Sequence, residues 1–131
     1  MSARPRIVVG ISGASGAAIA VRIVTLLHES RACEVHVVVS QAARRTLAHE
    51  VGRGAFDHLR CLADTLHPVT DVGASIASGS FRTAGMIIAP CSIRTLGALA
   101  AVNLDNLLLR AADVHLKERR KLVLLLRESP L

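Results

Sequence analysis

The sequence predicts a doubly wound α/β fold of the flavodoxin or Rossmann type, in which a parallel sheet carries helices on both faces. Three observations favour this fold. Short β-branched runs alternate with helical segments, small hydroxyl and glycine residues follow the runs, and 51% of the 131 residues are hydrophobic. Because this length is typical of one domain, we expect residues 1–131 to form a single α/β domain.

The first part of the chain predicts two strand–helix units. Each unit joins a short β-branched run, which suits a buried parallel strand, to a segment with helical character. The four expected elements are a strand over Arg6–Ile11, a helix over Ala17–Glu29, a strand over Val35–Val39 and a helix over Gln41–Glu50.

The next stretch, Val51 to Ser80, is less regular because four glycines and Pro68 interrupt its periodicity. We expect at most a short helix over Phe56–Ala63 there, followed by a loop-rich insertion. Beyond it the alternation of strand and helix resumes. The expected elements are a strand over Gly85–Ala89 that Pro90 stops, a short helix over Thr95–Ala101, a longer helix over Leu104–Glu118 and a strand over Lys121–Leu126.

The carboxyl ends of parallel strands meet at one edge of the sheet, and ligands of doubly wound folds bind there. Small, hydroxyl-bearing or basic residues follow the strands of this sequence: Ser12 to Gly16, Ser40, Pro90 to Thr95, and Arg127 to Ser129. Several of them also begin helices, whose unpaired amide groups and dipoles attract phosphate. The edge is therefore predicted to bind a phosphate-bearing ligand.

The glycines after the first strand narrow the choice of ligand. Gly10, Gly13 and Gly16 are spaced G-x-x-G-x-x-G, whereas dinucleotide folds use G-x-G-x-x-G and an acidic residue about 20 positions later. The second strand ends instead in Val39-Ser40, and the sequence lacks the G-K-[ST] of a Walker loop. A mononucleotide such as FMN is the better match. The alternative, that Gly13 and Gly16 only let a strand and a helix pack closely, stays open.

The longest predicted helix carries a polar stripe. Asn106, Arg110, Asp113 and Lys117 are spaced four, three and four apart, which places them on one helix face. Arg110 and Lys117 are suited to holding a phosphate, with Asp113 orienting Arg110. A solvated face with an Arg110–Asp113 pair is the competing interpretation.

Other chemically capable residues have two interpretations each. Glu50 and Glu128 lie near the carboxyl edge and are candidates for acid–base chemistry or ordinary surface carboxylates. Cys91 is either a small buried hydrophobe or a reactive thiol. His58 and Cys61 are spaced as metal ligands can be, but no second pair accompanies them, so no metal site is expected.

Charge and composition disfavour several function classes. Lys and Arg outnumber Asp and Glu by 16 to 10, but they are scattered, and only Phe56 and Phe81 are aromatic, which argues against nucleic-acid binding. Three cysteines without a C-x-x-C pair fit a reducing cytoplasm. Glycines and an arginine interrupt the apolar N-terminal region, so neither a signal peptide nor a membrane span is expected.

At these same residues the sequence resembles the UbiX-type flavin prenyltransferases, also known as the small subunit of aromatic acid decarboxylase systems. The matching segments run in order through nearly the whole chain. They are VGISGASGA (Val9 to Ala17), VVSQAARRTLAHE (Val38 to Glu50), ASIASGSF (Ala74 to Phe81), IIAPCSIRTLGALA (Ile87 to Ala100) and LLRAADVHLKERRKLVLLLRESPL (Leu108 to Leu131).

The resemblance implies an enzyme that joins the dimethylallyl group of dimethylallyl phosphate to reduced FMN. No metal is required, because a monophosphate carries less charge than a diphosphate. The product, prenylated FMN, is implied to serve a partner UbiD-type decarboxylase that acts on aromatic or unsaturated acids. The family further implies a homo-oligomer, commonly a dodecamer. From this together with the cysteine count and the composition, we expect a cytoplasmic protein without a nucleic-acid or membrane partner.

The resemblance also implies roles for individual residues. Contacts with FMN are implied for Ala14, Ser15, Gly16, Ser40, Ser92, Ile93, Arg94, Thr95 and Arg127. Catalytic roles are implied for Ser15 at the flavin ring edge, Glu50 near the reacting flavin nitrogen, and Arg110, Lys117 and Glu128 at the phosphate of the prenyl donor. These charges suit the reaction, since breaking an allylic C–O bond leaves negative charge on the departing phosphate.

The resemblance departs from the family at the C-terminus. Relatives continue for several dozen residues with a helix, a strand and a final helix, which carry a Tyr and a basic residue for the donor phosphate. Ser129-Pro130 is a helix-start signal, so we expect a C-terminally truncated family member. The strand over Lys121–Leu126 is then expected to keep an uncovered apolar face.

Two other functions stay open. A non-catalytic FMN-binding or assembly subunit keeps the flavin pocket but cannot hold the prenyl donor. A flavoprotein decarboxylase of the cysteine-decarboxylase type shares the fold, but Lys117, Glu128 and the lack of that group's His-based motif disfavour it.

Overall fold

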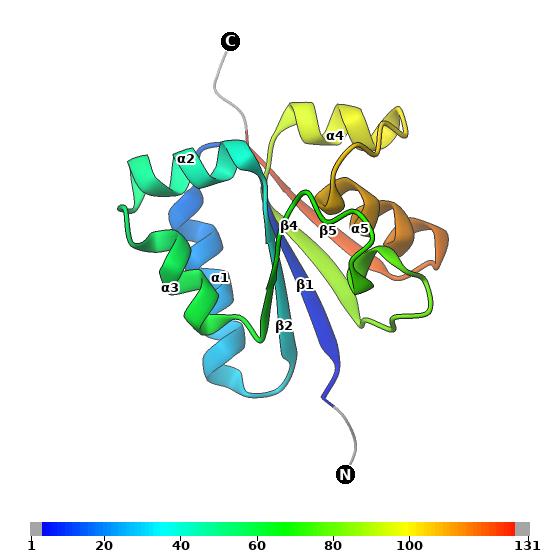
Figure 1. Cartoon of the computed structure of the whole chain (residues 1–131), viewed down its shortest axis with the longest axis horizontal. Helices are drawn as coiled ribbons and strands as arrows, with labels where there is room; N and C mark the ends of the chain where they lie inside the picture. The colour runs from blue at the N-terminus through cyan, green and yellow to red at the C-terminus, as the bar shows by residue number, and fades with distance from the viewer. Residues whose placement is uncertain (1–3, 128–131) are drawn as a thin grey trace.

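The computed structural model describes residues 4–127, which contain a five-stranded parallel sheet in the order β3-β2-β1-β4-β5 (Figure 1). Strands and helices alternate along most of the chain. In order, the elements are β1 (Arg6–Ile11), α1 (Ala17–Ser30), β2 (Glu34–Val39), α2 (Gln41–Glu50), α3 (Ala55–Leu62), β3 (Thr65–His67), the 3-10 turn η1 (Ser75–Ala77), β4 (Gly85–Cys91), α4 (Ile93–Ala100), α5 (Leu107–Lys117) and β5 (Lys121–Leu126).

Successive side chains of β1 enter two separate cores, because alternate residues of a strand point to opposite faces of the sheet. Val9 packs into the core on the side of α1, α2 and α3, while Val8 packs into the core on the side of α4 and α5, and both are fully buried. Figure 1 shows the two groups of helices on opposite sides of the sheet. The predicted doubly wound α/β fold is therefore confirmed.

One strand was not predicted. β3 consists of Thr65–His67 and pairs with His36, Val37 and Val38 of β2, in the region expected to be a loop-rich insertion. Three residues, two of them polar, are too few to show a strand period. Its place in the sheet comes from pairing with the buried strand β2.

The expected end of the strand at Pro90 was wrong. β4 continues to Cys91, although proline cannot donate a hydrogen bond to a neighbouring strand. The register between β4 and β5 shifts between Ile88 and Cys91, so an irregularity in the pairing coincides with Pro90.

In the second half of the chain, two helices begin at other residues than predicted, because a side chain caps each of them. The hydroxyl of Ser92 accepts a hydrogen bond from the amide of Thr95 at 3.1 Å, so α4 begins at Ile93. The side chain of Asn106 accepts from the amide of Leu109 at 2.9 Å, so α5 begins three residues later than expected. Within residues 4–127, no helix combines the length and the apolar character needed to cross a membrane.

The outer strand β5 shows the expected apolar face. Leu122 and Leu124 pack into the core beside α5, whereas Val123, which alternates with them, is 46% exposed. Within the described residues, nothing covers this side of Val123 as α5 covers the other side.

The loop after α4 contains a strained residue. Val102 has a φ of 57°, in the left-handed region that β-branched residues rarely adopt, and its side chain is 64% exposed. The amide of Asn103 donates to the carbonyl of Ala98 at 2.8 Å, which is the helix-ending pattern that usually places glycine at this position. The backbone hydrogen bonding of the turn thus holds a valine where glycine is preferred.

We expect Val102→Gly to stabilise the protein by about 1 kcal/mol, because glycine adopts the left-handed conformation without the steric cost that an L side chain meets. Urea unfolding measures the difference. Val72→Gly is the matched control, since Val72 is also an exposed valine in a loop but is not among the described residues with positive φ. An equal gain in both variants would contradict the assignment of strain to Val102.

Candidate functional site

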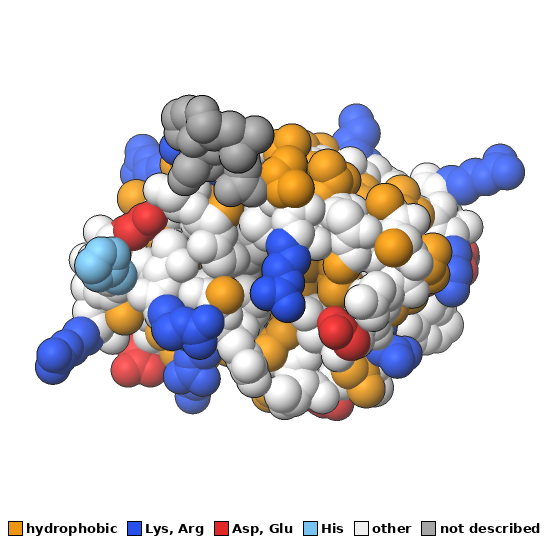
Figure 2. All heavy atoms as spheres, turned by 90° about the horizontal axis from the view of Figure 1, so that it is seen from above, with side chains coloured by type: hydrophobic (Ala, Val, Ile, Leu, Met, Phe, Trp, Pro, Cys, Tyr) orange, Lys and Arg blue, Asp and Glu red, His pale blue; other side chains and the backbone are white. Residues whose placement is uncertain are grey.

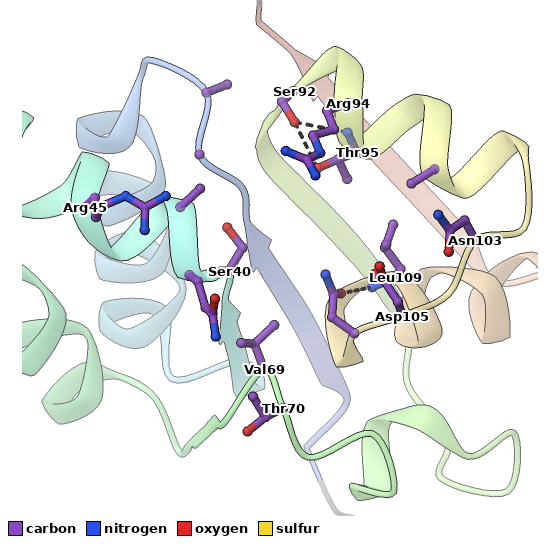
Figure 3. A pocket seen from close by; sticks show the side chains of 16 residues that line it. Ser40, Arg45, Val69, Thr70, Ser92, Arg94, Thr95, Asn103, Asp105 and Leu109 are labelled. Carbon is purple, nitrogen blue, oxygen red and sulfur yellow. Dashed lines mark hydrogen bonds between the residues drawn. The ribbon is translucent and has the colours of Figure 1, made fainter.

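A cavity of about 710 Å³ opens at the carboxyl edge of the sheet (Figure 3). Its wall comes from the turn after β1, the start of α2, the segment after β3, the start of α4, and the loop that leads into α5. The lining residues are Gly13, Ala14, Ser40, Gln41, Ala42, Arg45, Val69, Thr70, Ser92, Arg94, Thr95, Ala98, Asn103, Asp105, Asn106 and Leu109. The size lies within the range of about 300–1,000 Å³ for small-molecule sites.

The cavity edge is positively charged and rich in polar groups. Arg45 and Arg94 line opposite sides of it, on α2 and α4, and Asp105 contributes an acidic group. Seen from above, Lys and Arg side chains project around a surface that is otherwise largely uncharged (Figure 2). Two arginines facing one cavity favour an anionic ligand.

Two serines at strand ends hold helix starts against the cavity. Ser40 follows β2, and its hydroxyl accepts from the amide of Ala43 at 3.0 Å. The amide of Ser40 donates to the carbonyl of Ile11, the last residue of β1, at 3.0 Å. Ser92 follows β4. Its hydroxyl accepts from the amide of Thr95 at 3.1 Å and donates to the hydroxyl of Thr95 at 2.9 Å. Both helix starts therefore present polar backbone and hydroxyl groups at the cavity wall.

The start of α1 is occupied differently. The Oε1 atom of Glu50 accepts hydrogen bonds from the amides of Gly16 at 3.0 Å and Ala17 at 3.1 Å. The amides of Gly16 and Ala17, and then the hydroxyl of Ser15, lower the pKa of Glu50. A carboxylate of this chain thus already satisfies the helix start that the glycine-rich turn precedes.

The close approach of the glycine turn to α2 explains Gly13. A Cβ at Gly13 would lie 2.6 Å from the Cβ of Ala42, so a larger residue would push the turn and α2 apart. Gly16 has a φ of 111°, which also favours glycine. Close packing is therefore one role of these glycines, and Gly13 also lines the cavity.

The structure brings together part of the predicted flavin-binding set. Ala14, Ser40, Ser92, Arg94 and Thr95 all line the cavity. The other members are not part of its lining: Ser15, Gly16, Ile93 and Arg127.

These four residues, which do not line the cavity, nevertheless come shortly after the carboxyl ends of β1, β4 and β5. The guanidinium of Arg127 lies 3.8 Å from the position that a Cβ would take at Gly16, so the end of β5 approaches the start of α1. Ser15, next to the cavity-lining residue Ala14, helps to lower the pKa of Glu50 through its hydroxyl. Glu128 lies outside the described residues.

Arg110 and Lys117 are not among the residues that line the cavity. Only the start of α5, at Asn106 and Leu109, reaches the lining. Lys117 is eight residues beyond Leu109, which corresponds to about 12 Å along a helix. The predicted set of catalytic residues is therefore not assembled around one cavity in a single chain.

The expected pairing of Asp113 with Arg110 was wrong. The Oδ2 atom of Asp113 accepts from the ammonium of Lys117 at 2.8 Å, an i, i+4 pair in the favourable order of acid before base. Asn106, on the same predicted stripe, instead caps α5. The pairing leaves Asp113 holding Lys117 in place.

Cys91 is fully buried, and burial raises the pKa of its thiol. It is absent from the cavity lining, so the buried interpretation describes it better than the reactive one. Among residues 4–127 the structure shows no group of three or more His, Cys, Asp or Glu side chains arranged to hold a metal ion.

Most of the residues that line the cavity lie outside the predicted flavin-binding set. The sequence singled out Gly13 and Asn106 for other reasons, and it missed Gln41, Ala42, Arg45, Val69, Thr70, Ala98, Asn103, Asp105 and Leu109. Val69 and Thr70 were missed because β3, which precedes them, was not predicted. The Asp105-Asn106 pair before an apolar run is a helix-cap signal that marks a loop at this edge.

Comparison with known proteins decides the family. Residues 1–130 match the Flavoprotein family. The chain belongs to this family. Among curated relatives of this flavoprotein, it is 60% identical to the flavin prenyltransferase UbiX of Thauera aromatica over 126 residues, which cover 96% of this chain and 64% of that one. It is 52% identical to the flavin prenyltransferase UbiX of Escherichia coli strain K12, over 96% of this chain and 66% of the relative.

Solved structures place the flavoprotein in the same group. AnUbiX (PadA1), solved in complex with FMN and dimethylallyl pyrophosphate, superposes with a TM-score of 0.92 at 44% identity and covers 98% of this chain and 67% of that one. A dodecameric FMN-dependent UbiX-like decarboxylase from Escherichia coli O157:H7 gives a TM-score of 0.92 at 47% identity, over 96% and 68%. The resemblance to UbiX-type proteins is confirmed, and the chain spans about two-thirds of the length of these relatives.

The cysteine-decarboxylase alternative receives only fold-level support. The FMN-dependent cysteine decarboxylase TvaF superposes with a TM-score of 0.73, but its sequence is 16% identical over 96% of this chain and 75% of that one. This similarity shows a shared fold and nothing more specific.

We expect the stability that Glu50 contributes to depend on pH. Because hydrogen bonds from Gly16 and Ala17 lower its pKa below the usual 4.5, the contribution is complete above pH 4.5 and is lost as the pH falls through the lowered pKa. The wild-type protein should therefore have a higher free energy of unfolding than Glu50→Gln above pH 4.5, and this difference should shrink below pH 4.5.

Denaturant unfolding at a series of pH values measures this difference. Glu29→Gln, at the exposed far end of α1, is the matched control. A difference for Glu50→Gln that stays constant down to about pH 2.5 would show that the carboxylate does not cap α1 in solution.

Proposed function

We propose that this chain binds FMN and acts in a UbiX-type flavin prenyltransferase, which joins the dimethylallyl group of dimethylallyl phosphate to reduced FMN. The observation that carries the proposal is the carboxyl-edge cavity lined by Ala14, Ser40, Ser92, Arg94 and Thr95, in a chain 60% identical to a flavin prenyltransferase. A relative of the same fold was solved with FMN and dimethylallyl pyrophosphate.

The residues of the cavity fit FMN. Its phosphate would meet the start of α4, where the Thr95 hydroxyl and the Arg94 guanidinium are the donors, because Ser92 already accepts from the Thr95 amide and donates to the Thr95 hydroxyl. The start of α1 is a poorer phosphate site, because Glu50 already accepts its amide hydrogens. The flavin ring would lie toward the wider wall formed by Thr70 and the loop into α5. When bound in reduced form, FMN supplies the nucleophilic ring that receives the dimethylallyl group.

Ser15 and Glu50 form a polar pair beside the glycine turn. The backbone amides of Gly16 and Ala17 hold the carboxylate, and the Ser15 hydroxyl contributes to the lowered pKa of Glu50. We assign to Ser15 the orientation of the flavin ring edge and to Glu50 the handling of a proton at that edge. The lowered pKa keeps Glu50 ionised at neutral pH, so its carboxylate can accept a hydrogen bond at the ring edge, although the same hydrogen bonds make it a weaker base.

The residues proposed for the donor phosphate act from another copy of the chain. Lys117 is exposed, held by Asp113 and far along α5 from its own cavity. Arg110 is likewise exposed and does not line the cavity. Positive charge from both residues, and a proton from Glu128, would stabilise the departing phosphate without a metal. A relative that assembles as a dodecamer supports a homo-oligomer in which such a site forms between subunits.

The remaining parts of the proposal follow from the chemistry of the product and from the cysteines. Prenylated FMN would be consumed by a UbiD-type decarboxylase acting on aromatic or unsaturated acids. Cys33, Cys61 and Cys91 are free thiols, as expected for a protein of the reducing cytoplasm. The chain would serve as a single FMN-binding domain.

The reaction itself tests the proposed function. Protein incubated with reduced FMN and dimethylallyl phosphate should increase the flavin mass by one dimethylallyl group, as measured by mass spectrometry. Tight FMN binding with unchanged flavin mass would favour the non-catalytic FMN-binding or assembly subunit. Absence of flavin binding would contradict both functions.

Lys117→Ala should leave FMN affinity within about twofold and slow prenyl transfer by about 100-fold, as expected when one donor to a developing charge is removed. The exposed Lys121→Ala is the matched control for loss of a positive charge. Equal losses of FMN binding and transfer in Lys117→Ala would contradict the role assigned to Lys117.

Arg94→Ala should weaken FMN binding about 10- to 100-fold, because a charge-assisted contact to phosphate contributes about 1.5–3 kcal/mol. Flavin fluorescence titration measures the affinity. Arg53→Ala removes the same charge from an exposed loop outside the cavity and should have little effect. If Arg45→Ala, and not Arg94→Ala, weakens binding, the phosphate lies at α2 instead of α4.

A further inference from the structure

The segment of residues 68–84 crosses the α5 side of the sheet between β3 and β4, and we call it the strap. It contains η1 and contributes Val69 and Thr70 to the cavity wall. Ile76, at its centre, is 1% exposed and packs into the core beside α5. The carbonyl of Val69 accepts from the amide of Leu107 at 2.9 Å, which joins the strap to the start of α5. The position of the strap therefore shapes the cavity.

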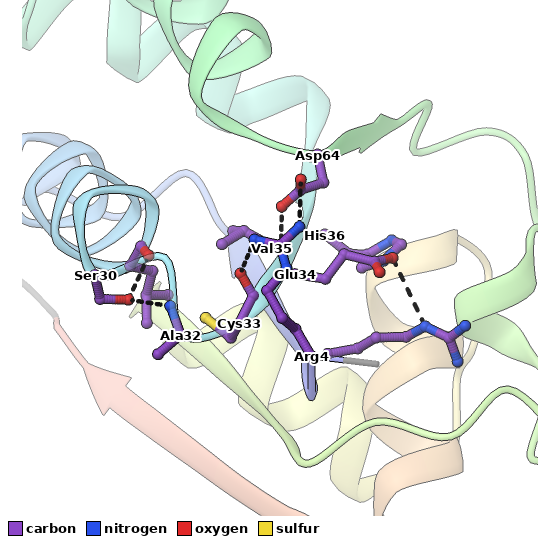
Figure 4. Close-up of polar contacts among 10 residues, drawn as sticks. Arg4, Ser30, Ala32, Cys33, Glu34, Val35, His36 and Asp64 are labelled. Carbon is purple, nitrogen blue, oxygen red and sulfur yellow. Dashed lines mark hydrogen bonds and ion pairs between the residues drawn. The ribbon is translucent and has the colours of Figure 1, made fainter. Parts of the chain in front are cut away.

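A buried histidine pair anchors the beginning of the strap. His67, the last residue of β3, is 8% exposed, and its Nε2 atom lies 2.9 Å from Nδ1 of His36 on β2, which is 4% exposed. The two rings stack with centroids 5.2 Å apart. Nε2 of His36 in turn lies 2.6 Å from Oε1 of Glu34, at the start of β2, where Figure 4 shows both residues.

The pair has room for one bridging hydrogen. The Glu34 carboxylate accepts from Nε2 of His36, and a single hydrogen lies between Nδ1 of His36 and Nε2 of His67, carried by one of these two nitrogens and accepted by the other. If both rings were fully protonated, two N–H groups would face each other across 2.9 Å. Full protonation is therefore incompatible with this contact.

A second buried histidine anchors the end of the strap. His115 on α5 is fully buried, and its Nδ1 atom lies 2.7 Å from the carbonyl of Ala111, so Nδ1 donates. Its Nε2 atom then accepts from the hydroxyl of Thr83 at 2.6 Å. A proton on Nε2 would place a charge in a fully buried site.

The charged neighbours of the two histidine sites come from every surrounding element. On β1, Arg6 lies 3.7 Å from Glu34 and stacks over Phe81 of the strap at 4.0 Å. Asp71 of the strap favours a charged His67, whereas Arg120, between α5 and β5, disfavours a charged His115.

Two arginines also hold the strap through its backbone. Arg120 donates to the carbonyls of Gly79 at 2.6 Å and Phe81 at 3.1 Å, and Arg6 donates to that of Arg82 at 3.2 Å. The carboxylate of Glu118 approaches Gly79. These contacts do not depend on the protonation of the histidines.

We propose that the strap is an acid-released part of the cavity wall, held closed by neutral His67 and His115 and opened when they are protonated. Opening would expose both histidines to water and withdraw Val69 and Thr70 from the cavity. The proposal depends on the contacts of the strap and not on which ligand the cavity binds.

The direction of the pH effect follows from burial. Burial lowers the pKa of His67, and the neighbouring His36 lowers it further while Asp71 opposes both. Burial also lowers the pKa of His115, with Arg120 adding to the effect and the Ala111 carbonyl opposing it. The open state binds more protons, so the opening equilibrium rises as the pH falls below the usual histidine value of 6.5. Each histidine that stays neutral in the closed state of the strap raises the opening constant about tenfold between about pH 7.5 and pH 5.5.

Hydrogen exchange of the ligand-free protein tests the proposal. After correction for the intrinsic pH dependence of exchange, amides of residues 68–84 should show opening constants that rise at least about tenfold between about pH 7.5 and pH 5.5. Amides of α1 should show no comparable rise. An equal rise in α1 would indicate global unfolding and would overturn the proposal, as would a pH-independent strap.

Variants assign the effect to the histidines. His67→Gln keeps an amide that can donate to or accept from His36 but does not titrate. The rise in the opening constant between about pH 7.5 and pH 5.5 should therefore be about tenfold smaller than in the wild type. His58→Gln, which replaces an exposed histidine on α3, should behave as wild type. An unchanged pH dependence in His67→Gln would overturn the role of His67.

Ring titration of the wild-type protein by NMR supplies a measurement that needs no variant. Titration of His67 and His115 below pH 6.5, in step with loss of strap protection, supports the proposal. Titration of both rings while the strap amides stay protected would overturn it, because the closed strap would then accommodate the charges.

Discussion

The carboxyl edge of the sheet depends on the buried hydroxyl of Ser12. It follows β1, is 2% exposed, donates to the carbonyl of Pro90 at 2.6 Å and accepts from the amide of Ser92 at 2.9 Å. One side chain thus joins the ends of the two central strands and positions the turn before α4. Both the glycine turn and the start of α4 are held relative to each other through this contact, and these segments form facing parts of the cavity wall.

Two helix starts at this edge have different electrostatic partners. Glu50 occupies the start of α1 and satisfies two of its amides. The start of α4 is capped by the neutral Ser92 and has Arg94 in its first turn. Glu50 therefore makes the start of α1 a poorer site for an anion than the start of α4. The glycine-rich turn thus holds a carboxylate of the chain near the cavity.

The sequence predicted most of the fold because buried parallel strands have a strong local signal. The runs at Arg6–Ile11 and Lys121–Leu126 were identified with the observed bounds. β3 was missed, since its position depends on pairing with β2 and not on its own composition. Asp113 was paired with the wrong residue because spacing alone allows both Arg110 and Lys117, and only the side-chain conformations select Lys117.

By itself, the sequence determined the alternation of strands and helices, the small and hydroxyl residues at the strand ends, and the kinship with UbiX-type flavoproteins, because these are carried by local pattern and by matching segments. Only the tertiary structure decided that Glu50 caps α1, that Lys117 lies far from its own cavity, and that His67 and His115 fasten the strap. Such contacts join residues far apart in the chain, and no local periodicity encodes which distant partner a polar side chain will meet.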